Sequence, residues 1–333
     1  MENGILTAVG NTPLVRLEKV LGDVQFQLFA KLEALNPGGS MKDRPALSII
    51  RHGIETGAVR PGTVVIESSS GNMGIGLAQI CSYYGLRFIC VVDPKTTQQN
   101  ISILRAYGAE IDLVREPDRE TGEFLLARKD RVKYLIGTIE DSFWPDQYSN
   151  IYNPIGHYDT LREIVSALGR VDYLFCATST CGTIRGCAEY ARQHDLRLKL
   201  VAVDAIGSVI FGGQSEKRLI PGHGAAVRPA LFEPGLADRC IRVSDLDCVI
   251  GCRRLVRREA VLAGGSSGAI ITAVESVRGE IAPGSVVVVI LADRGERYLD
   301  TIFSDEWVMG HFGDVSHLWE ESLREEPCVM ATY

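Results

Sequence analysis

The chain has 333 residues, 46% of them hydrophobic and 23% charged, with a formal net charge of −7. This length leaves room for two domains, and the composition is that of an ordinary folded protein. No basic tract or basic and aromatic stripe is present to neutralise phosphates, so the sequence argues against nucleic acid and favours small molecules as partners.

The first residues, MENGILTAVG, lack the basic and apolar regions of a signal peptide, and the longest apolar stretch, 286–292, is too short to span a bilayer. We therefore expect a cytoplasmic protein without membrane contact. The nine cysteines include no CxxC pair. They are expected to be reduced thiols, with neither a disulfide framework nor a metal site.

Short β-branched runs alternate with amphipathic stretches in both halves of the chain. In the first half this pattern predicts strands at 63–68, 87–93 and 109–114, and helices at 75–85 and 101–108. In the second half it predicts strands at 171–177, 199–205 and 285–291, and helices at 183–194, 244–263 and 267–277. Such alternation is typical of parallel sheets covered by helices, so the predicted fold class is α/β.

The aromatic and polar stretch at 141–154, DSFWPDQYSNIYNP, interrupts this alternation and indicates a domain junction. We expect a smaller, movable N-terminal α/β domain at 1–146 and a larger C-terminal one at 147–333. Part of 10–35 is expected to pack on the larger domain. Two open twisted sheets arranged in this way predict a ligand-binding cleft between them.

Two motifs lie in the first half. In NPGGSMKDR, 36–44, a glycine pair precedes Lys42 and a helix; taken alone, this is a solvated helix start with an exposed lysine. In VVIESSSGNMGIG, 64–76, a strand, hydroxyls and glycines precede a helix, which is suited to binding a carboxylate or phosphate. The glycines run G-x-x-G-x-G, so the spacing does not predict a dinucleotide site.

Two further motifs lie in the second half. In YLFCATSTCGTIRG, 173–186, small hydroxyl residues link a strand to a helix, where backbone amides can hold a phosphate; a capped helix without ligand is the alternative. In LAGGSSGAII, 262–271, the pattern G-x-S-x-G is also found in serine hydrolases, so one alternative is a hydrolase with Ser266 as nucleophile. That motif requires a preceding strand, whereas the residues before it repeat with helical spacing.

Taken together and in this order, the four segments resemble the β-family of pyridoxal-phosphate enzymes, which includes cysteine synthase and cystathionine β-synthase. The resemblance runs from GNTPLVRL at Gly10 to SDEW at Trp307. It implies a tryptophan synthase β-like fold (fold type II), with the cofactor in the cleft of a homodimeric enzyme.

The resemblance also implies roles for individual residues. Lys42 would carry pyridoxal phosphate covalently, and Asn72 would hydrogen-bond the ring hydroxyl oxygen. Ser69 and Ser70, with Asn72, would clasp the substrate α-carboxylate, and Gln147 would be a further contact. The phosphate-binding loop would be Ser179, Thr180, Cys181, Gly182 and Thr183.

Two positions compete to face the pyridine nitrogen of the cofactor. Ser266 in GGSSG matches the cystathionine synthase pattern, whereas Asp293 in ADRGERY stands where cysteine synthases carry a serine. We assign Ser266. A neutral hydroxyl there limits delocalisation of charge into the ring and favours elimination.

The chain departs from cysteine synthase in SSSGNMG and STCGT, which replace TSGNTG and GTGGT. With NPGGSMKDRPA, VDAIGSVIFGG and LADRGERYLD, these segments look closer to the siderophore-pathway branch, the N-(2-amino-2-carboxyethyl)-L-glutamate synthases. The implied substrates are O-phospho-L-serine and L-glutamate, and the product is a precursor of 2,3-diaminopropionate.

A phosphate leaving group and a dicarboxylate nucleophile call for a cation at the cleft. Arg128 and Tyr148 are the candidates for substrate binding, although ARKDRVK is typical of a solvated helix face; Arg218 and Arg228 are alternatives. Three other functions stay open: a plain cysteine synthase, a serine hydrolase using Ser266, and a homologue that binds ligands without catalysis.

Overall fold

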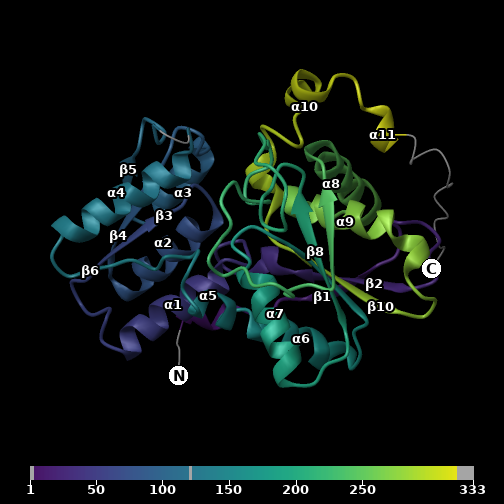
Figure 1. The fold of residues 1–333 in the computed structure, drawn as a ribbon, viewed down its shortest axis with the longest axis horizontal. Coiled ribbons are helices and arrows are strands. Elements are labelled where there is room, and N and C mark those ends of the chain that lie inside the picture. Colours follow the sequence, from purple (N-terminus) through teal and green to yellow (C-terminus); the bar gives the residue numbers. More distant parts are fainter. Residues whose placement is uncertain (1–3, 120–121, 321–333) are drawn as a thin grey trace.

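The structure, a computed structural model, describes residues 4–119 and 122–320, which form two α/β halves side by side (Figure 1). Each half is built on its own sheet. The small half comprises residues 43–143 around a four-stranded sheet, and the large half is built on a six-stranded sheet. The predicted fold class, α/β with two sheets, is confirmed.

The small half contains a fully parallel sheet in the order β5-β4-β3-β6. Its strands are β3 (Val64–Ser68), β4 (Arg87–Val92), β5 (Glu110–Leu113) and β6 (Ser142–Phe143). The helices of this half are α1 (Asp43–Glu55), α2 (Asn72–Tyr84), α3 (Gln98–Ala106) and α4 (Phe124–Thr138). The strands and helices predicted between 63 and 114 are confirmed.

The large half contains a sheet in the order β1-β2-β10-β7-β8-β9, parallel except for the β1-β2 pair. Its strands are β1 (Leu14–Leu17), β2 (Gln27–Leu32), β7 (Tyr173–Ala177), β8 (Lys199–Ala205), β9 (Arg239–Val243) and β10 (Val286–Leu291). The first two strands therefore belong to the large half, the chain crosses to the small half after β2, and it returns through 144–157.

Helices cover both faces of the large sheet (Figure 1). They are α6 (Tyr158–Leu168), α7 (Gly182–Gln193), α8 (Asp245–Glu259) and α9 (Gly265–Ser276). Beyond α8 and α9 lie α10 (Asp305–Phe312) and α11 (His317–Glu320), of which α11 packs on α8. The short helix α5 (Tyr152–Ile155) packs against α1 and α7 and so lies between the halves. No helix in 4–119 or 122–320 is long and apolar enough to cross a bilayer.

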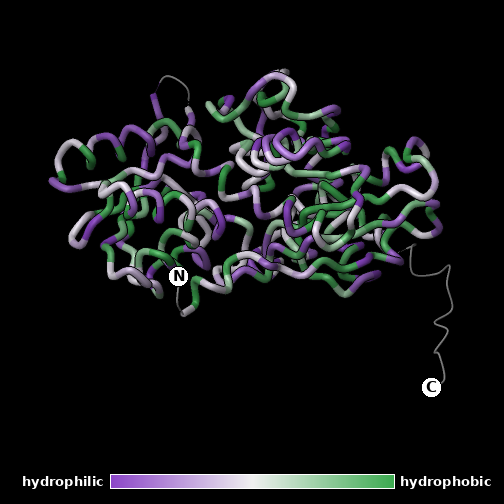
Figure 2. Tube along the Cα trace, turned by 90° about the horizontal axis from the view of Figure 1, so that it is seen from below, coloured by the Kyte–Doolittle hydropathy of each residue, from purple (hydrophilic) through white to green (hydrophobic). Residues whose placement is uncertain are grey.

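The continuous apolar sequence of β10 follows from burial on both faces. Val287 and Val289 pack into one core with α8 and α9, whereas Val288 and Ile290 pack into a second core with α6 and α7. Figure 2 shows hydrophobic segments gathered in the interior of the large half. A strand in this position has no solvated face, so side chains on both faces must be apolar.

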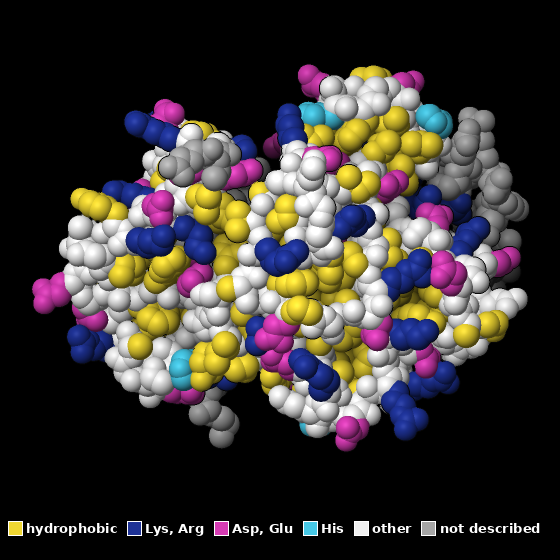
Figure 3. Space-filling view, in the orientation of Figure 1, with side chains coloured by type: hydrophobic (Ala, Val, Ile, Leu, Met, Phe, Trp, Pro, Cys, Tyr) yellow, Lys and Arg dark blue, Asp and Glu magenta, His cyan; other side chains and the backbone are white. Residues whose placement is uncertain are grey.

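The ends of three parallel strands define where a site can form. Ser69 follows β3, Thr178 follows β7, and Asp293 lies just beyond β10. In open α/β sheets, ligands bind at the carboxyl ends of the strands. Figure 3 shows the surface notched between the two halves.

Candidate active site

Lys42 lies where the two halves meet, immediately before helix α1. The amide of Met41 donates to the carbonyl of Ala292 at 2.8 Å, so the backbone before the lysine is fixed to the end of β10. Burial lowers the pKa of Lys42 from 10.5 to about 8, and the negative charge of Asp293 opposes this effect. The lowered pKa leaves more free amine near neutral pH, as a nucleophile or base requires.

The loop between β3 and α2 holds Ser69, Ser70 and Asn72. Ser69 is buried, and its Oγ accepts a hydrogen bond from the amide of Gly74 at 2.9 Å, which fixes the first turn of α2. Ser70 is half-buried. Asn72, the first residue of α2, donates from Nδ2 to Asp293 Oδ2 at 2.7 Å and thereby bridges the cleft.

The loop from Ser179 to Thr183 joins β7 to α7. Among the described residues, the amides of Ser179, Thr180, Cys181 and Thr183 have no hydrogen-bond partner. Cys181 has a φ of 66°, a left-handed conformation uncommon outside glycine. Unpaired amides at a helix N-terminus are suited to a phosphate group.

Gly182 in this loop cannot carry a side chain. A Cβ there would lie 2.0 Å from Oδ1 of Asn153, whose Nδ2 donates to the carbonyl of Gln147 at 2.6 Å. The loop therefore packs directly on the segment that joins the halves.

These features fit the cofactor that the resemblance implies. Lys42 supplies a buried amine for the covalent link, and the 179–183 loop supplies unpaired amides for a phosphate. Asn72 retains a second hydrogen on Nδ2 for a ring oxygen.

Ser266 lies in the first turn of α9 and is half-buried. The Oγ of the adjacent Ser267 accepts from the amide of Ala292 at 3.1 Å, which attaches this turn to the end of β10. Before Ser266 the chain forms α8 and a single bridge residue, Ala263. The strand that a hydrolase nucleophile elbow requires is therefore missing from this position.

Gln147 and Tyr148 lie beside the β3–α2 loop. Gln147 is buried, and its Nε2 donates to the carbonyl of Ser68 at 3.2 Å. Burial raises the pKa of Tyr148, and the positive charge of Arg128 opposes that rise. The phenol is thus neutral and close enough to Arg128 to respond to its charge.

Arg128 is buried, with an exposed fraction of 7%, although its sequence context is typical of a solvated helix face. Its Nε lies 3.1 Å from Asp93 Oδ2, and its Nη1 is buried without a hydrogen-bond partner in the described part of the chain. By contrast, Arg218 donates to the carbonyl of Gly207, and Arg228 donates to a backbone carbonyl at 3.1 Å. Of the three arginines, Arg128 retains the buried, unused donor.

A buried ionic cluster near Lys42 was not anticipated. Arg44 Nε lies 2.7 Å from Glu33 Oε2, and Arg44 Nη2 lies 2.8 Å from Glu163 Oε2. Lys31 Nζ lies 2.6 Å from the same Glu163 oxygen. This cluster joins α1 to β2 and α6. In the sequence, the only sign of it was that Lys31 and Glu33 carry charges within the largely apolar segment QLFAKLE.

His157 was also missed, because a lone histidine in sequence carries no specific signal. It is fully buried, and its Nε2 lies 3.3 Å from Thr183 Oγ1. Burial and the charges of Lys42 and Arg44 hold its pKa well below the usual range, so the ring is neutral. Through its contact with Thr183, His157 supports the first turn of α7.

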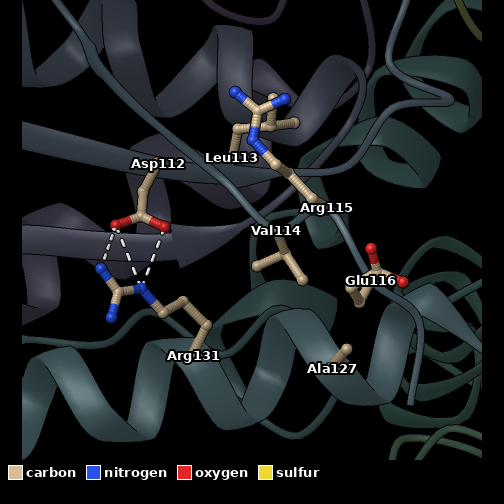
Figure 4. Close-up of a pocket in the computed structure, with 7 residues that line it drawn as sticks. All are labelled: Asp112, Leu113, Val114, Arg115, Glu116, Ala127 and Arg131. Atoms are coloured by element: carbon tan, nitrogen blue, oxygen red, sulfur yellow. Dashed lines mark hydrogen bonds and ion pairs between the residues drawn. The ribbon is translucent and has the colours of Figure 1, made fainter. Parts of the chain in front are cut away.

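The surface also has pockets away from these residues. One, of about 550 Å³, is lined by Asp112, Leu113, Val114, Arg115, Glu116, Ala127 and Arg131 (Figure 4). Its Arg131 is paired with Asp112 at 2.7 Å, whereas the guanidinium of Arg115 points away from that pair. None of the residues predicted for the site lines this pocket.

Comparisons with known proteins agree with the geometry. The family model of pyridoxal-phosphate dependent enzymes matches residues 5–293. The structure is similar to an O-acetylserine dependent cystathionine β-synthase from Helicobacter pylori, with 31% identity, a TM-score of 0.83, and coverage of 90% of this chain and 98% of that one.

Two further structures are similar over most of their length. A hydrogen sulfide-producing enzyme from Fusobacterium nucleatum is 33% identical, with a TM-score of 0.83 and coverage of 90% and 100%. O-ureido-L-serine synthase is 30% identical, with a TM-score of 0.82 and coverage of 93% and 99%.

Proposed function

The chain belongs to the family of pyridoxal-phosphate dependent enzymes, and on that premise we propose that it joins O-phospho-L-serine to L-glutamate. The products would be N-(2-amino-2-carboxyethyl)-L-glutamate and phosphate, in the pathway to 2,3-diaminopropionate and siderophores. In this β-replacement the Cβ–O bond to phosphate breaks, and the glutamate nitrogen forms a new bond to Cβ.

Lys42 has two roles in this proposal. Pyridoxal phosphate, when bound, stabilises the negative charge left at Cα after the proton departs. The lysine amine holds the cofactor before substrate arrives and, once displaced, removes the Cα proton. Its pKa of about 8 suits both roles, because a fully protonated amine could perform neither.

The residues around the β3–α2 loop would orient the substrate. Ser69, Ser70 and Asn72 would hold the α-carboxylate at the start of α2, with Gln147 as a further contact. Amides of residues 179–183 would hold the cofactor phosphate, and Ser266 would face the pyridine nitrogen. We further propose that 1–146, apart from its strands in the large sheet, closes toward 147–333 and excludes water.

The observation that carries the choice of substrates is the buried, unused Nη1 of Arg128. A phosphate ester carries up to two negative charges, and a guanidinium is the side chain best suited to bind it. Tyr148, a neutral phenol that responds to the charge of Arg128, can donate a further hydrogen bond. A substrate with an acetyl leaving group has no phosphate, so Nη1 of Arg128 would stay without a hydrogen-bond partner.

Product identification tests the proposal. The purified protein is incubated with O-phosphoserine or O-acetylserine, each combined with glutamate, other amino acids or sulfide, and the products are identified by mass spectrometry. The proposal expects the carboxyethyl-glutamate product from phosphoserine and glutamate. Formation of cysteine alone would instead establish the second candidate, a cysteine synthase; the name of the similar H. pylori enzyme gives O-acetylserine as the substrate of that protein.

The covalent role of Lys42 has a direct test. Borohydride reduction followed by peptide mapping is expected to find the pyridoxyl group on this lysine. The Lys42→Ala variant should lose both the adduct and the visible absorption of the bound cofactor. A wild-type protein that binds no cofactor would instead support a ligand-binding homologue without catalysis.

We also propose that the enzyme is a homodimer, as the family resemblance implies. Sedimentation of the holoprotein would report twice the chain mass of 36.4 kDa. A monomer at all concentrations would contradict this assembly without affecting the proposed chemistry.

A further inference from the structure

Asn72 and Asp293 meet across the cleft although 221 positions separate them in sequence. Asn72 begins α2 in the small half, whereas Asp293 follows β10 in the large half. The distance from Asn72 Nδ2 to Asp293 Oδ2 is 2.7 Å. This hydrogen bond therefore ties a residue implied in cofactor binding to the opposite half of the molecule.

The chemistry of the pair fixes the orientation of the Asn72 amide. Asp293 Oδ2 is the acceptor in this hydrogen bond, so the amide presents its Nδ2 to Asp293 and turns its Oδ1 away. Nδ2 carries two hydrogens, and Asp293 uses one of them. The second stays available to an acceptor on the other side of the same nitrogen.

Asp293 is itself held firmly in place. The hydroxyl of Tyr298 donates to the same Oδ2 at 2.6 Å, and the side chain has an exposed fraction of only 2%. Because Tyr298 and Asn72 both donate to it, Asp293 acts purely as an acceptor. Its Oδ1 is buried without a hydrogen-bond partner among the described residues and lies against Gly264, where a Cβ would come within 2.2 Å.

We propose that Asp293 is a positioning residue that fixes the polarity of the Asn72 amide, so that Nδ2 donates to the ring hydroxyl oxygen of the cofactor. This inference rests on the proposed function, because only in that proposal does Asn72 contact the cofactor. Without the carboxylate, the amide can rotate by half a turn and present its carbonyl oxygen, which would repel the ring oxygen. Asp293 thus acts on the cofactor through Asn72 and not by touching the ring.

The test compares two substitutions at this position in the full-length protein. Asp293→Ala removes the acceptor, whereas Asp293→Asn retains a carbonyl acceptor without the charge. For each variant, the dissociation constant of pyridoxal phosphate and the visible absorption spectrum of the bound cofactor are measured. We expect Asp293→Ala to weaken binding on the order of tenfold and to alter the spectrum, and Asp293→Asn to restore part of both.

A double-mutant cycle separates positioning from a general structural effect. If Asp293 acts through Asn72, then Asp293→Ala should have little further effect on affinity or spectrum in an Asn72→Ala background. Asp172→Asn is the matched control, because Asp172 accepts from the amide of Val286 at the opposite end of β10. This control should leave cofactor affinity unchanged, and circular dichroism would report whether each variant is folded.

Additive effects in the cycle, or an Asp293→Ala variant with wild-type affinity and spectrum, would overturn the inference. Both outcomes leave the proposed function intact, because the wild-type protein would still bind its cofactor on Lys42. A wild-type protein that binds no pyridoxal phosphate would instead refute the proposed function, before any variant is compared.

Discussion

A side chain at position 264 would collide with Asp293 and Tyr298, which we propose to lie beside the cofactor site. A Cβ there would lie 2.2 Å from Asp293 Oδ1 and 2.5 Å from Tyr298 Cε2. We therefore expect Gly264→Ala to lower the free energy of unfolding by about 1–3 kcal/mol and to weaken cofactor binding. Denaturant unfolding measures the first effect and spectroscopic titration the second.

Gly137→Ala is the matched control for this substitution. Gly137 lies inside helix α4, and nothing is found within 4 Å of a Cβ built there. Alanine should be neutral or raise stability by roughly 0.5–1 kcal/mol. If the two variants were equally stable, the neighbours of position 264 would have room for a Cβ, and the predicted collision would be wrong.

Arg128 gives a second prediction at the scale of one residue. Arg128→Met should reduce kcat/KM for O-phosphoserine by roughly 30-fold or more, because a charged hydrogen bond to the phosphate is lost. The same variant should change kcat/KM for O-acetylserine far less, which controls for damage to the fold. Parallel losses for both substrates would contradict a role in recognising phosphate.

The sequence indicated the candidate site unevenly, and the reason differs from residue to residue. Lys42, Asn72 and the 179–183 loop could be named as candidates because short motifs in a fixed order carry them, and their roles stay predictions. The burial of Arg128 was not, because only the packing of α4 on the sheet distinguishes it from the exposed charges beside it. The contact of Asn72 with Asp293 depends on the relative placement of the two halves.

At the scale of elements, the cluster of Lys31, Arg44 and Glu163 joins β2, α1 and α6. Burial tends to raise the pKa of Glu163, but its contacts with Arg44 and Lys31 outweigh this and lower the pKa to about 2. A carboxyl group whose pKa is lowered by folding stabilises the protein above its unfolded pKa of 4.5. That contribution is lost as the pH falls through the folded value.

We therefore expect Glu163→Gln to destabilise the protein by about 3–5 kcal/mol at neutral pH, because it leaves the buried Lys31 without a carboxylate partner and Arg44 with Glu33 alone. The deficit should shrink between about pH 4.5 and pH 2, where wild-type Glu163 becomes protonated. Urea unfolding of both proteins across this range measures the difference. A deficit that does not depend on pH would contradict the assigned ionic role.

The strands and helices themselves were largely predictable, since β-branched runs and amphipathic stretches depend on local sequence. The order of the strands was not. β10 is the last strand in sequence but lies between β2 and β7, and nothing in its apolar sequence identifies those neighbours. The stretch at 141–154 contains the two-residue strand β6 and most of the short helix α5. Its irregular composition had indicated a break in the regular alternation of strands and helices.

At the scale of the whole molecule, the proposed cofactor site draws residues from both halves. A ligand that binds only the folded state stabilises it by about 2.7 kcal/mol at a concentration one hundred times its dissociation constant. Adding pyridoxal phosphate to cofactor-free protein should therefore raise Tm, and Lys42→Ala should reduce the rise. Thermal unfolding with and without cofactor measures both effects, and an equal rise in the two proteins would contradict the covalent role.

The central position of β10 has a consequence for how the chain is made. As the polypeptide leaves the ribosome, the small half is complete long before residues 286–291 appear, whereas β2 waits with an unpaired edge. Insertion of β10 between β2 and β7 therefore completes the large sheet, and it carries Asp293 to Asn72. We expect nascent chains truncated before β10 to leave the edge of β2 exposed.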